Sequence, residues 1–326
     1  MKKTLVALAV AAVAASASAT TVYNQNGTKV EVGGRLDVVL GEFGKNQHVD
    51  LRNNDSRLEF KVEHEIQNGL KALGFYRLGL GGLEGNTEKQ NTFDDLNTKK
   101  LWLGLEQADI GRLTFGKQDT TADAVQMNDH AYIFGGNNNL FTSDNKVVSF
   151  RSADWKLAEG QTFGFGLDYG FGNSDKTAKN EAKDTYGVSV FYAGQFGDLT
   201  AGLNAGYTHE RNKVEKTVNS NRSSWRVATQ VGFNSASFGV EYGQSKHANS
   251  KEKKLLVGAK YGVLPEVANL YAQYQHNKED NQKAAKVYIV GADYAFNKNV
   301  VAYAEFANKR QDDKENKYAA GLRVYF

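Results

Sequence analysis

The sequence predicts an all-β chain that crosses a membrane as a closed, antiparallel, transmembrane β-barrel of sixteen strands. Apolar and polar residues alternate with a period of two along most of the chain, and sixteen such segments can be counted. The links between these segments alternate between short turns and long polar loops. A mean hydropathy of −0.54 is typical of a soluble protein, but a barrel strand needs an apolar residue only at every second position.

The composition excludes several other classes of protein. No run of about 20 apolar residues follows the N-terminal segment, so no membrane-spanning helix is predicted. The absence of cysteine excludes disulfides, thiolate metal sites and cysteine nucleophiles. A formal net charge of only +3 disfavours nucleic-acid binding, because phosphate recognition needs a clustered basic surface. The single proline fits a strand-rich chain, since proline cannot donate to a strand ladder.

The N-terminus has the three parts of a secretory signal peptide. Met1–Lys3 is basic, Leu5–Ala15 is apolar, and Ala17–Ala19 supplies the small residues that a signal peptidase accepts. We therefore expect residues 1–19 to be cleaved. The remaining residues, 20–326, are predicted to form a single barrel domain outside the cytoplasm.

The strands are recognised by their alternation. Every second residue of Phe163–Phe171 is aromatic or leucine and the residues between are Gly or Asp, and the same pattern recurs in Leu199–Tyr207 and Trp225–Phe233. Small polar side chains on the second face suit the lining of a water-filled lumen, while the apolar face suits lipid. In order, the predicted strands are 29–43, 55–66, 70–83, 97–106, 111–118, 146–155, 161–172, 185–196, 199–209, 223–233, 237–246, 254–262, 267–276, 285–296, 299–308 and 317–326.

The links between strands favour a barrel over a sandwich. The short links have turn chemistry, as in Asn68-Gly69, Gly197-Asp198 and Asn297-Lys298. Short turns at one end and long loops at the other are typical of outer-membrane barrels, and sixteen strands leave an aqueous channel. The long links are charged and polar: 84–95, 173–184, 210–221, 246–253, 277–283 and 309–316.

The final strand is expected to close the barrel, because every backbone N–H and C=O within the hydrocarbon must be paired inside the protein. Its apolar parity carries Tyr318, Leu322, Val324 and the terminal Phe326. We expect these residues to face lipid and to form the signal read by the barrel assembly machinery.

Several segments resemble the Gram-negative general diffusion porins, most closely the major outer-membrane porins of the Pasteurellaceae. The resemblance is carried by Val22–Arg35, Asp55–Lys61, Gly104–Gly111, Leu113–Lys117 and Gly321–Phe326. It implies a homotrimer of sixteen-stranded barrels in the outer-membrane lipid that passes ions and small hydrophilic solutes by passive diffusion, with the third loop folded inward. It implies no cofactor and no enzymatic activity.

The third loop is the longest connection, residues 119–145, and it contains an apolar stretch that a solvated external loop would not need. Phe134, Gly135 and Gly136 match the centre of the family's constriction motif. The resemblance therefore implies that this segment narrows the pore.

The acidic residues of this loop differ from those of the family. Ile133 stands where the family has an acid just before the Phe-Gly-Gly, and Asp129 matches the remaining acidic position. Asp119 and Asp123 lie nearby in the sequence. The loop is therefore expected to be less negative than in the best-known relatives.

Opposite the loop, the family places basic residues, and the matching positions here are Arg35, Arg57 and Lys99. Arg77 stands where the family often has an acid, and we expect it to join the same basic wall. Parity places Arg35 and Arg57 on the polar face, whereas Lys99 shares its parity with leucines and its face stays open. Basic residues facing Asp129 would set up a transverse field in a narrow passage. We expect the missing acid to favour anions or to leave the pore weakly selective.

Three other functions remain as alternatives. A sugar-selective porin would have an aromatic slide, but only Phe75, Phe191, Tyr271 and Tyr303 take the lumen parity. A closed-lumen adhesin or structural barrel would not conduct ions. A catalytic barrel would need a base and an orienting group beside a nucleophile, and no metal-ligand spacing stands out. The histidines lie mostly in or near predicted loops: His48, His64, His130, His209, His247 and His276.

Overall fold

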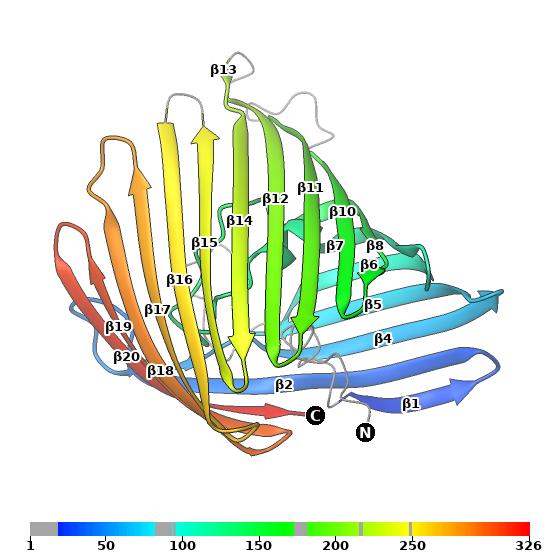
Figure 1. Ribbon diagram of the computed structural model, residues 1–326, viewed down its shortest axis with the longest axis horizontal. Coiled ribbons are helices and arrows are strands. Elements are labelled where there is room, and N and C mark those ends of the chain that lie inside the picture. The colour runs from blue at the N-terminus through cyan, green and yellow to red at the C-terminus, as the bar shows by residue number, and fades with distance from the viewer. Residues whose placement is uncertain (1–18, 82–92, 94–95, 173–180, 215–217, 248–249) are drawn as a thin grey trace.

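All sixteen predicted strands are present in the computed structural model, and they form one closed antiparallel barrel (Figure 1). Each pairs with the next along the chain, and β20 pairs with β2 to close the ring. The strands are β2 (Thr28–Glu42), β4 (Ser56–Gln67), β5 (Leu70–Leu80), β6 (Leu96–Gln107), β7 (Gly111–Asp119), β8 (Ser143–Ser152), β10 (Gln161–Phe171), β11 (Glu181–Phe196), β12 (Leu199–Val214), β14 (Arg222–Phe233), β15 (Ala236–His247), β16 (Ser250–Leu264), β17 (Ala268–Glu279), β18 (Ala285–Asn297), β19 (Val300–Arg310) and β20 (Lys314–Tyr325).

The structure describes residues 19–81, 93, 96–172, 181–214, 218–247 and 250–326. The predicted signal peptide, except Ala19, lies outside the described residues, as do parts of four of the predicted long links. Within the described ranges, the structure has no helix long and apolar enough to span a membrane.

Four short strands were not predicted: β1 (Thr20–Gln25), β3 (Asp50–Asn53), β9 (Trp155–Ala158) and β13 (Val218–Asn219). The first of them folds back on β2 through Asn26 and Gly27, whose φ angles of 51° and 73° allow a tight hairpin turn. Further along β2, Gly34 and Phe326 exchange backbone hydrogen bonds of 2.9 and 3.2 Å. The two ends of the described chain thus share one edge of β2, with β1 continuing where β20 stops.

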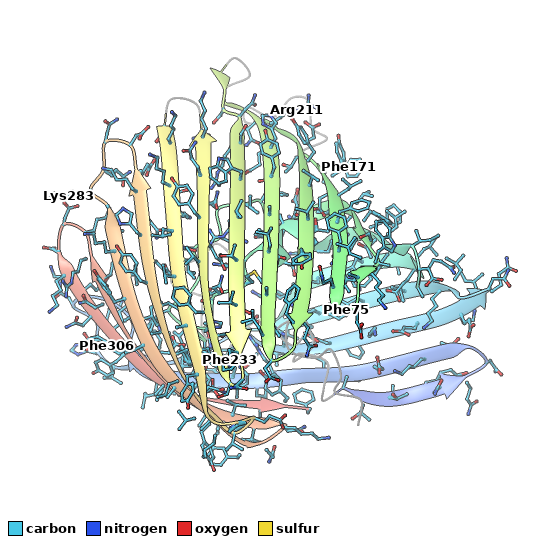
Figure 2. The ribbon with its side chains drawn as sticks, viewed as in Figure 1. Phe75, Phe171, Arg211, Phe233, Lys283 and Phe306 are labelled. Atoms are coloured by element: carbon cyan, nitrogen blue, oxygen red, sulfur yellow. The ribbon has the colours of Figure 1, made fainter. Side chains whose placement is uncertain are left out.

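The two faces of the wall differ as the alternation predicts. Large apolar side chains project outward, where Leu103 is 68% exposed and Phe233 is 57% exposed. Figure 2 shows such side chains around the wall, with Phe171, Phe233 and Phe306 labelled. The inner parity carries polar and charged residues, among them Arg226 and Glu241, both with no exposed surface. The barrel interior is therefore mainly polar, and its one apolar cluster among the described residues is formed by Ala122, Val125, Leu140 and Phe191.

The predicted closing-strand residues also lie on the outer parity. Tyr318 and Leu322 are 47% and 48% exposed, and Phe326 is 43% exposed. Val324 lies opposite Leu36 of β2, another exposed outer residue.

The tight turns gather at one end of the barrel, which we call the turn end, and the longest connections lie at the other, the loop end (Figure 1). The predicted long links 277–283 and 309–316 are shorter than predicted, 280–284 and 311–313, because the flanking strands extend into them. Asn68, Gly69 and Gly197 at the turn end have φ angles of 53°, 79° and 66°. These left-handed conformations suit glycine and asparagine and explain the turn chemistry of the sequence.

The third long connection has slightly narrower limits than predicted. Since β7 extends to Asp119 and β8 begins at Ser143, the connecting segment is 120–142 instead of 119–145. It contains a single turn of 3-10 helix, η1 (Thr121–Val125). We call residues 120–142 the inner segment, because its contacts are with the polar face of the barrel.

Candidate pore constriction

The inner segment is held by carboxylates that project from the barrel wall. Near its start, Asp168 of β10 accepts the Thr121 backbone N–H, with both carboxylate oxygens 3.0 Å from the nitrogen. Asp168 also accepts the Ser149 hydroxyl at 2.7 Å. Hydrogen bonds to a charged acceptor are stronger than neutral ones, so this end of the segment is firmly attached to the wall.

The middle of the segment is bound by an ion pair with no exposed surface. Glu241 of β15 accepts the backbone N–H groups of Met127 and Asn128 at 2.7 and 2.6 Å. The same carboxylate pairs with Arg226 of β14, whose Nε lies 2.8 Å from Glu241 Oε2. The Arg226 guanidinium also donates to the backbone carbonyl and side-chain oxygen of Asn137, at 3.2 and 2.8 Å.

The third anchor is Glu305 of β19. Its carboxylate accepts three successive backbone N–H groups, from Tyr132, Ile133 and Phe134, the last two at 3.1 and 3.0 Å. The Tyr271 hydroxyl donates to it at 2.8 Å. Because Asp168, Glu241 and Glu305 stand on strands β10, β15 and β19, the segment runs across a large part of the inner wall.

The Phe-Gly-Gly centre has a clear steric requirement. Asp129 accepts the Gly136 N–H at 2.6 Å and the Gln273 side-chain amide at 2.9 Å. A Cβ on Gly135 would lie 2.2 Å from the Asp129 Oδ1 atom, and Gly136 has a φ of 84°. Only glycine fits both conditions easily. Phe134 packs on Phe43 with ring centroids 6.2 Å apart.

The predicted arginines lie on the inner wall formed by β2, β4 and β5, and each is ion-paired. Arg35 and Arg57 both contact Asp55 at 2.7 Å. Arg57 and Arg77 both contact Glu59 at 2.7 Å. These residues form a ladder of alternating charge in place of an uncompensated basic surface.

A β-bulge decides the face of Lys99. Arg77 lies opposite Lys100, but the next residue of β5, Leu78, lies opposite Thr98, so Lys99 is the extra residue of β6. A Cβ on Gly79, on the inner parity, would lie 2.8 Å from both Cγ and Cε of Lys99. The bulge therefore turns both lysines inward.

Lys100 is a residue of this wall that the sequence pattern missed. Its ammonium forms an ion pair with Asp119, at the end of β7. Strict alternation assigns opposite faces to neighbouring residues, and no sequence signal marks the bulge. The family match names Lys99 alone, whereas the bulge turns both Lys99 and Lys100 toward this wall.

The acid of the inner segment that interacts electrostatically with this wall is Asp123. Its side chain reaches solvent, yet the surrounding protein and Asp119 raise the pKa of the Asp123 carboxyl to about 6, against the opposing effect of Lys100 and Arg77. The structure thus brings Asp119 and Asp123 together with the cations of β5 and β6. Asp129, by contrast, accepts a hydrogen bond from Gly136 within the inner segment and another from the side-chain amide of Gln273 on β17.

Further along, Arg323 of β20 extends the charge ladder. It lies 2.7 Å from Asp37 of β2 through its Nε and stacks 4.7 Å above the ring of Tyr132. Tyr132 also stacks on Tyr303, with centroids 4.4 Å apart. Arg323 was another omission of the sequence reasoning, although its inner parity in the last strand could have revealed it.

Most of the aromatic side chains predicted to face the lumen have little exposed surface. Tyr271 is 4% exposed, Tyr303 3% and Phe191 9%. Phe75 stacks on Trp102 with ring centroids 5.4 Å apart. Three of the four therefore contribute to packing around the inner segment and do not present a continuous aromatic surface to a passing solute.

The histidine of the inner segment carries little charge at neutral pH. Burial and the nearby Lys260 lower the pKa of His130 to about 4. Among the described residues, no group of three or more His, Cys, Asp or Glu side chains is arranged to hold a metal ion.

Comparison with known proteins agrees with this architecture. Residues 4–314 match the family described as Gram-negative porin. The chain is 35% and 36% identical to two major outer membrane proteins of Pasteurella multocida, one from strain Pm70, over the full length of both partners.

Solved structures with the same fold are more distant in sequence. The anion-selective porin of Comamonas acidovorans has a TM-score of 0.74 at 16% identity, covering 92% of this chain and all of that one. OmpF of Salmonella typhi has a TM-score of 0.73 at 17% identity, covering 94% and 100%. A trimer form of OmpT, an outer membrane protein of Vibrio cholerae, has a TM-score of 0.69 at 19% identity, covering 92% and 100%.

Proposed function

Because this chain belongs to the Gram-negative porin family and is an outer-membrane channel for passive diffusion, we propose that its ion selectivity is set where the inner segment approaches the wall of β2, β4, β5 and β6. The observation that carries this proposal is the ion-paired ladder of Arg35, Arg57 and Arg77 with Asp55 and Glu59.

The charge balance in this zone predicts a weakly selective channel. Every arginine of the ladder has a carboxylate partner at 2.7 Å. Asp123 adds a negative charge that is only partly ionised near pH 6. The two bulge lysines, Lys99 and Lys100, oppose it. A transverse field between the wall and the segment orients dipolar solutes, while the small net charge limits discrimination between cations and anions.

Reversal potentials in a KCl gradient across a planar bilayer test the proposal. Refolded wild-type protein is expected to give a small reversal potential. Arg57→Ser should shift it toward cations and Asp123→Lys toward anions, because the first removes a positive charge from the wall and the second replaces a negative charge of the inner segment by a positive one. Strong selectivity of the wild type, or equal potentials for both variants, would contradict the assignment.

The same recordings separate the alternative functions. A closed-lumen adhesin or structural barrel would give no conductance. A substrate-selective porin would show current block by its solute at low concentration, whereas a general diffusion channel would show none.

We further propose that the chain loses residues 1–19 and assembles as a homotrimer. The neighbouring Vibrio cholerae protein has a trimer form, and β2 offers Leu36 and Leu40, 50% and 54% exposed, as smooth contact surface. Conductance steps in threes and a trimer mass in detergent test the assembly, and N-terminal sequencing of the exported protein tests the cleavage. Phe326→Ser should reduce insertion by the assembly machinery if the last strand is its signal.

A further inference from the structure

One part of the lumen wall carries a row of stacked aromatic and arginine side chains. Phe75 of β5, labelled in Figure 2, lies directly opposite Trp102 of β6 on the lumen parity, and the two rings stack at an interplanar angle of 25°. The Cζ atom of Arg77 lies 5.5 Å from the centroid of the Phe75 ring. The Cζ atom of Arg112, on β7, lies 5.6 Å from the centroid of the Trp102 ring. We call these four residues the aromatic row.

The two rings lie one step closer to the turn end than the charged wall of the constriction. Arg77 and Lys100 are opposite each other in the β5–β6 ladder, and Phe75 and Trp102 form the next pair on the lumen face in the direction of the turn end. A solute that moves between the constriction and the turn end therefore passes the aromatic row.

The rings of the aromatic row are accessible from the lumen. Phe75 and Trp102 are both partly exposed. On the lumen parity, Gly116 lies opposite Trp102 and Gly104 follows it along β6, so neither position adds a side chain over the ring. The helical turn η1 of the inner segment packs mainly against β8, β10 to β12 and β14, on another part of the wall.

The two arginines of the row differ in their partners. Arg77 donates to the Glu59 carboxylate at 2.7 Å. Arg112 is exposed, and in the described part of the chain it forms no ion pair, although Glu106 lies opposite it in the β6–β7 ladder. Stacking on Trp102 uses the face of the Arg112 guanidinium, which leaves the N–H groups at its edge for a carboxylate.

A second arginine adds positive charge beside Arg112. Arg151 of β8 lies directly opposite Arg112 in the ladder, so the two share the lumen face. Arg151 pairs with Asp154 at 2.6 Å, and its Cζ lies 4.3 Å from the centroid of the Phe191 ring. Arg112 is therefore the cation of this pair that an external anion can reach, while Arg151 increases the attraction.

We propose that the aromatic row is a binding site for planar aromatic carboxylates in the lumen. The carboxylate would pair with the edge of the Arg112 guanidinium, and the ring of the solute would lie on the exposed surface of Phe75 and Trp102. The site is open to water on one side, so the expected dissociation constant is large, on the order of 10 mM. The proposal needs an open channel, but it does not depend on the charge assignment at the constriction.

Titration of the ion current in planar bilayers tests the proposal on the refolded full chain. Benzoate has both the aromatic ring and the charge, cyclohexanecarboxylate has only the charge, and benzamide has only the ring. Each solute is added to both sides of the bilayer. Benzoate is expected to reduce the wild-type KCl current at an about tenfold lower concentration than either of the other two.

Variants separate the two parts of the site. Arg112→Gln should reduce the potency of benzoate to that of benzamide, because the carboxylate loses its partner. Trp102→Leu should reduce it to that of cyclohexanecarboxylate, because the ring loses its stacking surface. The matched control is Lys71→Gln, which removes a cation of the same parity at the turn end that pairs with Glu63 at 3.8 Å. This control should retain the full preference for benzoate.

Tryptophan fluorescence locates the bound solute. The chain has three tryptophans, and Trp155 and Trp225 are on the outer face, 41% and 38% exposed. Replacing both by phenylalanine leaves Trp102 as the sole tryptophan. The probe is 4-nitrobenzoate, which quenches tryptophan fluorescence on contact. We expect it to quench Trp102, and we expect benzoate to reverse the quenching at an about tenfold lower concentration than cyclohexanecarboxylate.

Three outcomes would overturn the proposal. One is equal potency of benzoate and cyclohexanecarboxylate in the wild type, which would mean simple attraction of anions. Another is full benzoate potency in Arg112→Gln, a variant of an exposed residue that should fold normally. The third is block by benzoate without quenching of Trp102, which would place the solute elsewhere in the lumen. A barrel that conducts no KCl current would contradict the channel function itself, so the two failures are distinguishable.

Discussion

Two parts of the inner wall use buried charge in different ways. On β10, β15 and β19, Asp168, Glu241 and Glu305 accept backbone N–H groups of the inner segment. On β2, β4 and β5, carboxylates bind arginine side chains of the wall itself. The first set, the anchoring wall, holds a segment of chain in the lumen. The second, the ladder wall, leaves its charged groups facing the solute. The same residue type therefore determines shape on one side and electrostatics on the other.

The largest expected effect lies in the anchoring wall. Glu241→Ala leaves Arg226 buried without its carboxylate partner, and breaking a buried pair in this way costs about 3–5 kcal/mol. Urea-induced unfolding of the refolded protein measures the loss. Glu252→Ala is the control, because that partly exposed carboxylate pairs with Lys254 at 3.2 Å and should matter by about 0–1 kcal/mol. Equal losses in both variants would remove the distinction between the two kinds of charge.

A smaller effect is expected at the third anchor. Glu305→Gln replaces a charged acceptor of three backbone N–H groups by a neutral amide, which weakens the attachment of Tyr132–Phe134 by about 1.5–3 kcal/mol. We expect larger and noisier single-channel currents, because the segment can leave the wall. The control is Asp293→Asn on β18, which changes an acid that does not accept these backbone N–H groups, and its channel should keep the quiet currents of the wild type. A quiet Glu305→Gln channel of wild-type conductance would show that other contacts suffice.

The ion selectivity at the ladder wall is expected to respond to pH. Asp123 has a pKa raised to about 6, so it is mostly neutral below that pH and negative above it. The preference for cations should therefore rise, on the order of twofold, as the pH increases from 5 to 7. Reversal potentials at both pH values measure this change. In Asp123→Asn the response should be flat, and a persisting response would assign it to another group.

The smallest effect concerns the bulge in β6. Lys99→Gln and Lys100→Gln should each shift the reversal potential slightly in the same direction, toward cations, because the bulge turns both side chains inward. Lys117→Gln, opposite the exposed Leu101 on the outer parity, should leave it unchanged. An effect of Lys100→Gln alone would mean that Lys99 does not reach the passage.

Much of this architecture could be predicted because a barrel strand has a simple periodicity. Alternation located all sixteen strands, with the predicted limits of most strands close to those observed, and the family resemblance placed Arg35 and Arg57 on one wall. The glycines of the inner segment were also found, although the reason for Gly135, its contact with the Asp129 carboxylate, was not visible in the sequence.

Other features depended on contacts between distant parts of the chain. The anchoring role of Glu305 joins β19 to backbone groups more than 170 residues earlier, at Tyr132 and Phe134. Backbone N–H groups carry no sequence signal, so no pattern could identify them as ligands of a carboxylate. Likewise, strict alternation puts Lys99 on the face of its neighbouring leucines and gives no sign that Lys100 faces the lumen. The extra residue of the β6 bulge breaks this alternation, so both lysines face inward.

By itself, the sequence determined the local periodicity, the turns at one end and the two-faced composition, because each depends on neighbouring residues. Only the tertiary structure decided which acid faces the basic wall. Asp129 and Asp123 are both loop carboxylates in the sequence, but the folded segment uses the first for its own turn and brings the second toward Arg77 and Lys100. The physical reason is that electrostatic interaction follows distance in space, and closure of the barrel sets that distance.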